Sequence, residues 1–321
     1  MLSMRARVAV LAGAVVVLGG GAFAYVRSAA DRPAPQPSFA TVSLTPGPRL
    51  LTVTDRHLAV VPAGNPGGER TVSAVECVRA YASAGTGICL RQSTPWAYQV
   101  VVLDADLHDR RAIDIPGLPN RARVSASGRM VSWTTFVGGD SYTSSGFSTR
   151  TGILDTVGGT YVTTLEDFAI TRDGRPYRAV DVNFWGVTFA ADDTTFYATM
   201  STAGHRYLVR GDWAARTVET LRDNVECPSL SPDGTRIAFK QAIGGDPLKG
   251  WRLSVLTLSS GTVIETAEPE SVDDQAAWLG SATLAYTLRR GDGQPDVWTV
   301  PADGTGVSRL LIPGAESPSP L

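Results

Sequence analysis

Short apolar runs separated by Gly, Asp, Pro and Asn make up the chain from about residue 49 to residue 321. The runs are rich in Val, Ile, Thr and aromatic residues, which favour strands, and turn-forming residues bound them. No stretch in this part of the chain carries an apolar stripe at helical spacing that is long enough for a packed helix. The pattern therefore predicts an all-β domain.

The clearest unit of this pattern is ECPSLSPDGTRIAFKQ, residues 226–241. It predicts a short strand, a tight turn at SPDG and a second strand with an apolar triplet, IAF. Asp233 suits the turn because its side chain bonds nearby backbone, and Gly234 because glycine accepts a positive φ. The unit recurs without a gap in DDQAAWLGSATLAYTL, RVSASGRMVSW and GVTFAADDTTFYA, and more loosely from Glu76 onward. Four aromatic residues of the second strands are expected in the core: Trp133, Tyr197, Phe239 and Tyr286.

Two further strands follow each hairpin, which gives four antiparallel strands per unit. A four-stranded unit that repeats along the chain is typical of propeller blades, since no blade buries both of its faces alone. The C-terminal tail GAESPSPL resembles the opening strand ECPSLSP, whereas residues 49–75 read as three strands that lack an opening one. Pairing the two ends gives a composite closing blade. We therefore expect a six-bladed β-propeller over residues 49–321.

These residues carry a resemblance to a known family. LSPDGTRIAFK, with its weaker copies, resembles the WD-type repeat of the TolB β-propeller family. The resemblance covers the architecture of residues 49–321 and implies a non-catalytic, extracytoplasmic scaffold that binds a protein or peptide of the cell envelope. TolB itself carries a small α/β domain before its propeller, whereas an apolar segment and a Pro-rich linker lead into the strands here. The resemblance is therefore to the propeller alone.

The first residues have the pattern of an export segment. Arg5 and Arg7 precede an apolar run from Val8 to Val26. A helix over this run would span roughly 28 Å, close to the thickness of a bilayer core. The favoured interpretation is a single-pass membrane anchor within residues 1–27, followed by a Pro-rich linker at 28–48. The alternative is a signal peptide cleaved at the A-x-A pattern of residues 22–24, which would release the protein. Both place the propeller outside the cytoplasm.

Charge and motifs exclude several function classes. The formal net charge is -2 and no basic stripe is present, so nucleic acid is not an expected partner. The sequence holds no P-loop, no G-x-G-x-x-G and no G-x-S-x-G nucleophile motif. The three histidines are scattered, so we expect no metal and no cofactor. The chain is interpreted as a monomer without enzyme activity; the alternative is a propeller whose channel binds a small ligand or cation or carries out catalysis.

Cysteine spacing fits an oxidising compartment. Cys77 and Cys89 flank the turn-rich stretch ASAGTG, and a hairpin centred near Ser83 would bring them opposite each other as a disulfide. Cys227 is left over. The alternative is that all three cysteines are small buried residues.

One register position of the repeat suggests a site. The residue before Cys227 and its equivalents should lie where the innermost strands begin, around the mouth of the axial channel, and four of the six are acidic. Crowded carboxylates raise one another's pKa unless water or a cation offsets the field, so this mouth would attract a cation or a basic peptide, with a tryptophan as a stacking wall. The alternative is a set of solvated strand starts. The six residues are Glu76, Asn120, Trp185, Glu226, Asp273 and Glu316.

Long loops are predicted on one rim of the propeller. They join the second and third strands of a blade, or one blade to the next, and exceed what tight hairpins require. Long loops on a rigid scaffold are common binding sites, although tolerated insertions would give the same pattern. The segments are Asp167 to Asn183, GGDSYTSSG, QSTPWAY, GGDPLKG and RRGDGQP.

Overall fold

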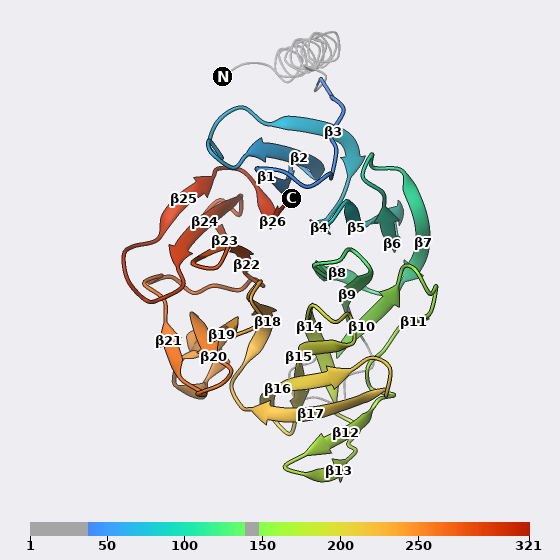
Figure 1. Cartoon of the computed structure of the whole chain (residues 1–321), viewed down its shortest axis with the longest axis vertical. Helices are drawn as coiled ribbons and strands as arrows, with labels where there is room; N and C mark the ends of the chain where they lie inside the picture. The colour runs from blue at the N-terminus through green and yellow to red at the C-terminus, as the bar shows by residue number, and fades with distance from the viewer. Residues whose placement is uncertain (1–37, 139–147) are drawn as a thin grey trace, which may run out of the picture. The chain divides into compact units, whose positions relative to one another are not determined.

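A computed structural model describes residues 38–138 and 148–321. The regular secondary structure of these residues consists of strands, apart from two 3-10 turns, Ile243–Gly245 and Pro247–Lys249. The strands form six sheets arranged in a ring (Figure 1). Each sheet is one blade, and its innermost strand lies nearest the axis. The prediction of an all-β, six-bladed propeller is confirmed.

The blades are numbered from the N-terminus. Blade 1 consists of β26 (Glu316–Pro320), β1 (Arg49–Thr54), β2 (His57–Pro62) and β3 (Thr71–Glu76). Blade 2 consists of β4 (Arg79–Ser83), β5 (Thr86–Thr94), β6 (Ala97–Leu103) and β7 (Asp109–Ile115). Blade 3 consists of β8 (Leu118–Val124), β9 (Met130–Val137), β10 (Ser148–Asp155) and β11 (Tyr161–Val162).

The remaining blades follow the same order from the axis outward. Blade 4 consists of β14 (Asn183–Phe189), β15 (Thr195–Thr202), β16 (His205–Asp212) and β17 (Thr217–Arg222), with β12 (Ala169–Arg172) and β13 (Arg175–Tyr177) added outside. Blade 5 consists of β18 (Glu226–Leu230), β19 (Arg236–Ala242), β20 (Trp251–Thr257) and β21 (Val263–Glu265). Blade 6 consists of β22 (Ala277–Leu279), β23 (Thr283–Arg289), β24 (Pro295–Pro301) and β25 (Arg309–Ile312).

Blade 1 is the composite blade that the sequence predicts. The C-terminal strand β26 pairs antiparallel with β1, and Leu51 lies opposite Ser319. The Ser319 hydroxyl also accepts a hydrogen bond of 3.2 Å from the backbone N–H of Ala82 in blade 2. The two ends of the described chain therefore close the ring, and β26 covers the inner edge of β1.

A bulge recurs in three of the innermost strands. Gly186, Cys227 and Ser317 all have positive φ, at 66°, 49° and 57°. The pairing with the second strand shifts across each of these sites, which is the mark of a β-bulge. Each residue directly follows a member of the predicted mouth set, so the register that aligned Trp185, Glu226 and Glu316 holds in the backbone. Glycine is required at 186, because a Cβ there would lie 2.8 Å from Cys227 Cα.

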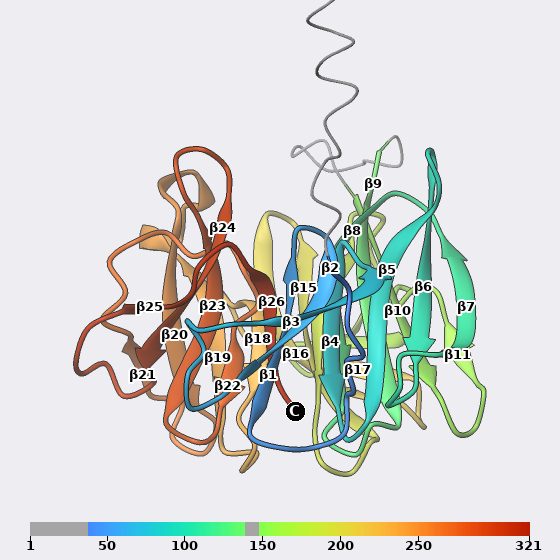
Figure 2. The same ribbon diagram turned by 90° about the horizontal axis from the view of Figure 1, so that it is seen from above.

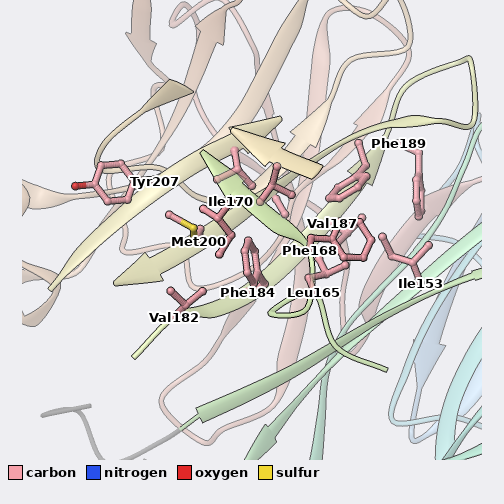
Figure 3. Close-up of a cluster of buried hydrophobic side chains, with 14 of the residues drawn as sticks. Ile153, Leu165, Phe168, Ile170, Val182, Phe184, Val187, Phe189, Met200 and Tyr207 are labelled. Carbon is pink, nitrogen blue, oxygen red and sulfur yellow. The ribbon is translucent and has the colours of Figure 1, made fainter. Parts of the chain in front are cut away.

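The core lies between adjacent blades, and its largest cluster joins blades 3 and 4 (Figure 3). Trp133, Phe239 and Tyr286 are buried as predicted, with 2%, 1% and 0% exposure. Tyr197 is only half-buried, and its neighbour Phe196 is the fully buried residue of that strand. The prediction for this strand was wrong by one residue, and a one-residue shift moves a side chain to the other face of a sheet.

The segment from Asp167 to Asn183 is not the free loop that the sequence predicts. Its first half forms β12, which pairs in parallel with β17, and β13 lies outside β12 at the edge of blade 4 (Figure 1). Phe168 and Ile170 are buried in the core cluster, with 5% and 8% exposure (Figure 3). Burial of these two side chains holds the segment against the outside of the blade.

The ring has two unlike faces. The loop face is the side on which the innermost strands begin and on which the hairpins between second and third strands lie; the turn face is the opposite side. The β5–β6 and β23–β24 hairpins project on the same side in Figure 2. The described chain also begins on the loop face, where the Phe39 ring lies 4.8 Å from the His57 ring at the β1–β2 hairpin. The predicted loop GGDSYTSSG falls almost entirely within residues 139–147, outside the described residues.

Candidate functional site

The axial channel carries buried charges at its loop-face end. Glu226 is the first residue of β18 and is 5% exposed. Its carboxylate lies 3.6 Å from Lys240 Nζ and 2.6 Å from Arg206 Nε. Lys240 Nζ also lies 2.5 Å from an oxygen of Asp273 and 4.3 Å from the centre of the Trp251 ring. The repeat thus places two carboxylates around one ammonium group.

Arginines from other blades complete this end of the channel. Arg121 of β8 reaches Asp273 across the ring, with 3.4 Å between Nη2 and Oδ1. Glu316, at the start of β26, lies 3.0 Å from Arg79 and 2.8 Å from Arg289. These contacts connect blades 1, 2, 3 and 6 by charge as well as by packing.

The predicted field of uncompensated carboxylates does not hold at Glu226, Asp273 and Glu316, because each lies within ion-pair distance of a Lys or Arg. Burial acts to raise the pKa of Asp273, but Lys240 and Arg121 outweigh it and lower that pKa overall. Burial raises the pKa of Glu226 in spite of Lys240. Lysine and arginine side chains of the protein therefore balance the carboxylates for which the sequence predicted a bound cation.

The other three predicted residues differ in their surroundings. Glu76 is the last residue of the outermost strand β3, and its 61% exposed side chain lies 3.8 Å from His57. Asn120 adjoins Arg121, and its carbonyl accepts a 3.3 Å hydrogen bond from that guanidinium. Trp185 is 9% exposed within β14. The ring that stacks on the channel cation is Trp251, which the sequence-based prediction missed.

A pocket of about 310 Å³ opens at the turn-face end of the channel, where the innermost strands end. Its lining comes from the ends of the innermost strands of all six blades and from the turns that follow these strands. Residues from the six blades include Tyr81, Val124, Phe189, Ser229, Trp278 and Pro320. Arg123 of β8 also lines this pocket and is 6% exposed. Its Nη2 donates hydrogen bonds to Ser229 Oγ at 3.3 Å and to the carbonyls of Gln275 at 3.1 Å and Ala276.

The sequence contains weak indications that Arg121, Arg123 and Lys240 are buried in the channel. Arg121 and Arg123 alternate in RARV, so both point to the same side of the innermost strand of blade 3. Lys240 directly follows the apolar triplet of blade 5. Charged side chains in strands otherwise expected to be buried are a sign of pairing in the folded protein.

Cys77 and Cys89 are joined by a disulfide, with 5.4 Å between their Cα atoms. They are not directly opposite, because Cys89 pairs with Ala80 and the hairpin turns at Ala84 and Gly85, slightly later than predicted. The bond therefore ties the connection between blades 1 and 2 to β5. Cys227 is free and buried.

Among residues 38–138 and 148–321, no three His, Cys, Asp or Glu side chains are placed to hold a metal ion. The same residues contain no helix long and apolar enough to cross a membrane. The predicted anchor at residues 8–26 lies outside the described residues.

The fold is similar to several solved propellers. TolB from Acinetobacter baumannii has a TM-score of 0.62 at 15% identity, over 86% of this chain and 67% of that chain. A chain of a nidogen/laminin complex has a TM-score of 0.58 at 13% identity, over 86% of this chain and 99% of that one. A putative TolB from Agrobacterium tumefaciens has a TM-score of 0.50 at 13% identity, with coverages of 84% and 90%.

The sequence matches no protein-family model, and no curated protein matches it. At identities of this size the similarity is one of fold. The chain is a six-bladed β-propeller whose fold is similar to that of TolB.

Proposed function

We propose that this protein is a non-catalytic binding scaffold of the cell envelope, which docks a protein or peptide partner on its loop face. The observation that carries the proposal is a pair of apolar side chains on that face. Trp96 is 94% exposed and Leu248 is 96% exposed. They belong to the hairpin loops of blades 2 and 5, which the ring holds in fixed places.

Isolated exposed apolar residues are ordinary, so the positions of these two matter. Trp96 lies at the tip of the β5–β6 hairpin, and Leu248 lies in the 3-10 turn between β19 and β20. Tryptophan contributes a large share of binding energy where it is buried on docking. A partner that contacts both loops would span a broad part of the loop face.

The start of the described chain supports a location close to a membrane. Phe39 lies on the loop face, and the Pro-rich segment of residues 28–38 precedes it. At about 3.1 Å per residue, this linker would reach roughly 34 Å. If residues 8–26 anchor the chain, the loop face stays within that reach of the bilayer, and the partner belongs to the same layer of the envelope.

The charged end of the channel supports a binding role over acid–base chemistry. Its carboxylates form ion pairs with lysine and arginine, and at Asp273 these cations lower the pKa, which disfavours its use as a proton donor near neutral pH. The similar folds agree with a protein partner, since one of them is a chain of a nidogen/laminin complex.

The test is a pull-down from membranes after mild crosslinking, which compares two double variants. Trp96→Ala/Leu248→Ala removes the loop-face residues. Val157→Ala/Val307→Ala is the matched control, because these residues are 79% and 60% exposed in loops of the turn face. We expect the first variant to lose the captured partner and the second to retain it. Equal capture by both variants would contradict docking through the loop face.

A further inference from the structure

The turn-face pocket contains a buried positive charge that lacks an anionic partner. Among the described residues, no carboxylate oxygen lies within 4.0 Å of the Arg123 guanidinium, although the side chain is well buried. Burial lowers the pKa of Arg123; at longer range Asp274 favours its charged form and Arg121 opposes it. A buried charge without a partner is unfavourable, so it is retained mainly where a bound group offsets it.

The hydrogen bonds of Arg123 leave donors available. A guanidinium has five N–H donors, and the three acceptors found among the described residues all contact Nη2. Nε is buried and has no hydrogen-bond partner among the described residues. The Tyr81 ring supports the guanidinium from one face, with 4.4 Å between Cζ and the ring centre. The group is therefore held in place by its contacts while part of its donor set stays free.

The pocket has the size and lining of a small-molecule site. About 310 Å³ lies at the lower end of the range for such sites. Val124, Phe189, Leu230 and Trp278 give it apolar walls. Ala126, Ala191 and Asp233 are exposed at its rim, so solvent reaches it from the turn face.

From this geometry we infer that the turn-face pocket binds a small organic carboxylate, whose charged group contacts Arg123 and whose apolar body lies against Phe189 and Trp278. A planar carboxylate matches the donors of a guanidinium. One guanidinium balances one negative charge.

Asp233 disfavours a doubly charged anion such as phosphate. Hydrogen bonds from Ser231 and Thr235 lower the pKa of Asp233 to about 2, so this rim residue stays negative at neutral pH. Like charges repel, and the repulsion grows with the charge of the ligand.

The experiment is isothermal titration calorimetry of the full-length chain with 3-phenylpropionate, with the neutral 3-phenylpropanamide and with inorganic phosphate. We expect saturable binding of the carboxylate, and binding at least about tenfold weaker for the amide and for phosphate. No saturable binding of the carboxylate, equal binding of the amide, or tighter binding of phosphate would overturn the inference.

Three variants locate the site. Arg123→Gln removes the guanidinium, and Ala191→Trp fills the rim from an exposed position without altering the buried contacts. Both should reduce carboxylate binding at least about tenfold. Arg175→Gln, which removes an exposed arginine from the edge strand β13, is the charge-matched control and should bind as the wild type does. If Arg123→Gln does not fold, the Ala191→Trp variant alone tests the site. Unchanged carboxylate binding by either variant, when folded, would contradict the assignment of the site to this pocket.

Discussion

At the scale of single residues, two buried cations of the channel differ in how their charge is balanced. Lys240 lies between Glu226 and Asp273, so its ammonium is neutralised within the protein. Arg123 has hydrogen bonds to carbonyl and hydroxyl oxygens but no carboxylate within ion-pair distance among the described residues. The first arrangement is expected to stabilise the native ring, and the second to favour a bound anion.

Lys240→Met should destabilise the protein, because it leaves Glu226 buried with Arg206 as its remaining ion-pair partner. Removal of one member of a buried ion pair costs about 3–5 kcal/mol of unfolding free energy. Urea unfolding of the unreduced protein measures the loss. Arg210→Gln breaks an ion pair between side chains that are 58% and 50% exposed, and it should change stability by less than about 1 kcal/mol. A Lys240→Met variant as stable as the wild type would show that the cluster does not stabilise the ring.

Glu166 should make stability depend on pH. Both of its carboxylate oxygens are buried and lack hydrogen-bond partners among the described residues, and burial raises its pKa to about 7 from 4.5. The folded state therefore binds the proton more tightly than the unfolded state. This contribution is fully present below about pH 4.5 and is lost as the pH rises through about 7. Glu166→Gln removes it.

The stability of Glu166→Gln relative to the wild type should therefore increase between pH 5 and pH 8, by about 1–3 kcal/mol. Urea unfolding of both proteins across this range measures the difference. A difference that is constant with pH would show that Glu166 is not neutral in the fold at low pH.

At the scale of strands, the innermost strand of each blade fixes both the closure of the ring and the position of the channel residues. The bulges at Gly186, Cys227 and Ser317 occur at equivalent positions of three of these strands. The strand β26 repeats this geometry with residues from the far end of the chain. Closure of blade 1 is therefore expected to contribute to the stability of the whole ring.

Removal of residues 314–321 should expose the inner edge of β1. The truncation deletes β26, the Ser319 bond to Ala82 and the Glu316 contacts with Arg79 and Arg289. At about 1 kcal/mol for each net hydrogen bond, we expect a loss of at least about 3 kcal/mol. Hydrogen exchange should show the largest loss of protection at β1, with less change at β15 on the far side of the ring. Full protection of β1 in the truncated protein would contradict this role of β26.

The blades could be predicted from the sequence because the turn between the first two strands, the apolar triplet of the second strand and the spacing between them recur together. The composite blade followed because GAESPSPL carries the same opening pattern as ECPSLSP. The β12–β13 addition was missed because its apolar residues, Phe168 and Ile170, are separated by a single residue in a polar segment. Their burial depends on contacts with blade 4 that local pattern does not specify.

The channel was predicted only in part. The register placed Glu226, Asp273 and Glu316 at the start of inner strands, but the compensating Arg121 lies 152 residues from Asp273 in the chain. Such pairing across the axis depends on closure of the ring, which no local pattern encodes. Trp251 was missed for a different reason: its contact with Lys240 depends on the register between the second and third strands of blade 5, which the repeat pattern did not give.

At the scale of the whole molecule, the two faces of the ring suit different ligands. The loop face carries Trp96, Leu248 and the start of the described chain, and it is proposed to dock a protein partner. The turn face opens into the pocket around Arg123, which is inferred to bind a small carboxylate. The charged cluster of Lys240 separates the two along the axis of one rigid scaffold.

The most direct test of the central claim is photo-crosslinking from single positions on the two faces, in membranes that contain the full-length protein. A photoreactive amino acid replaces Trp96 on the loop face or Val307 on the turn face, and both positions are exposed. We expect a defined crosslinked protein or peptide from position 96 and none from position 307. The same adduct from position 307, with none from position 96, would contradict this expectation.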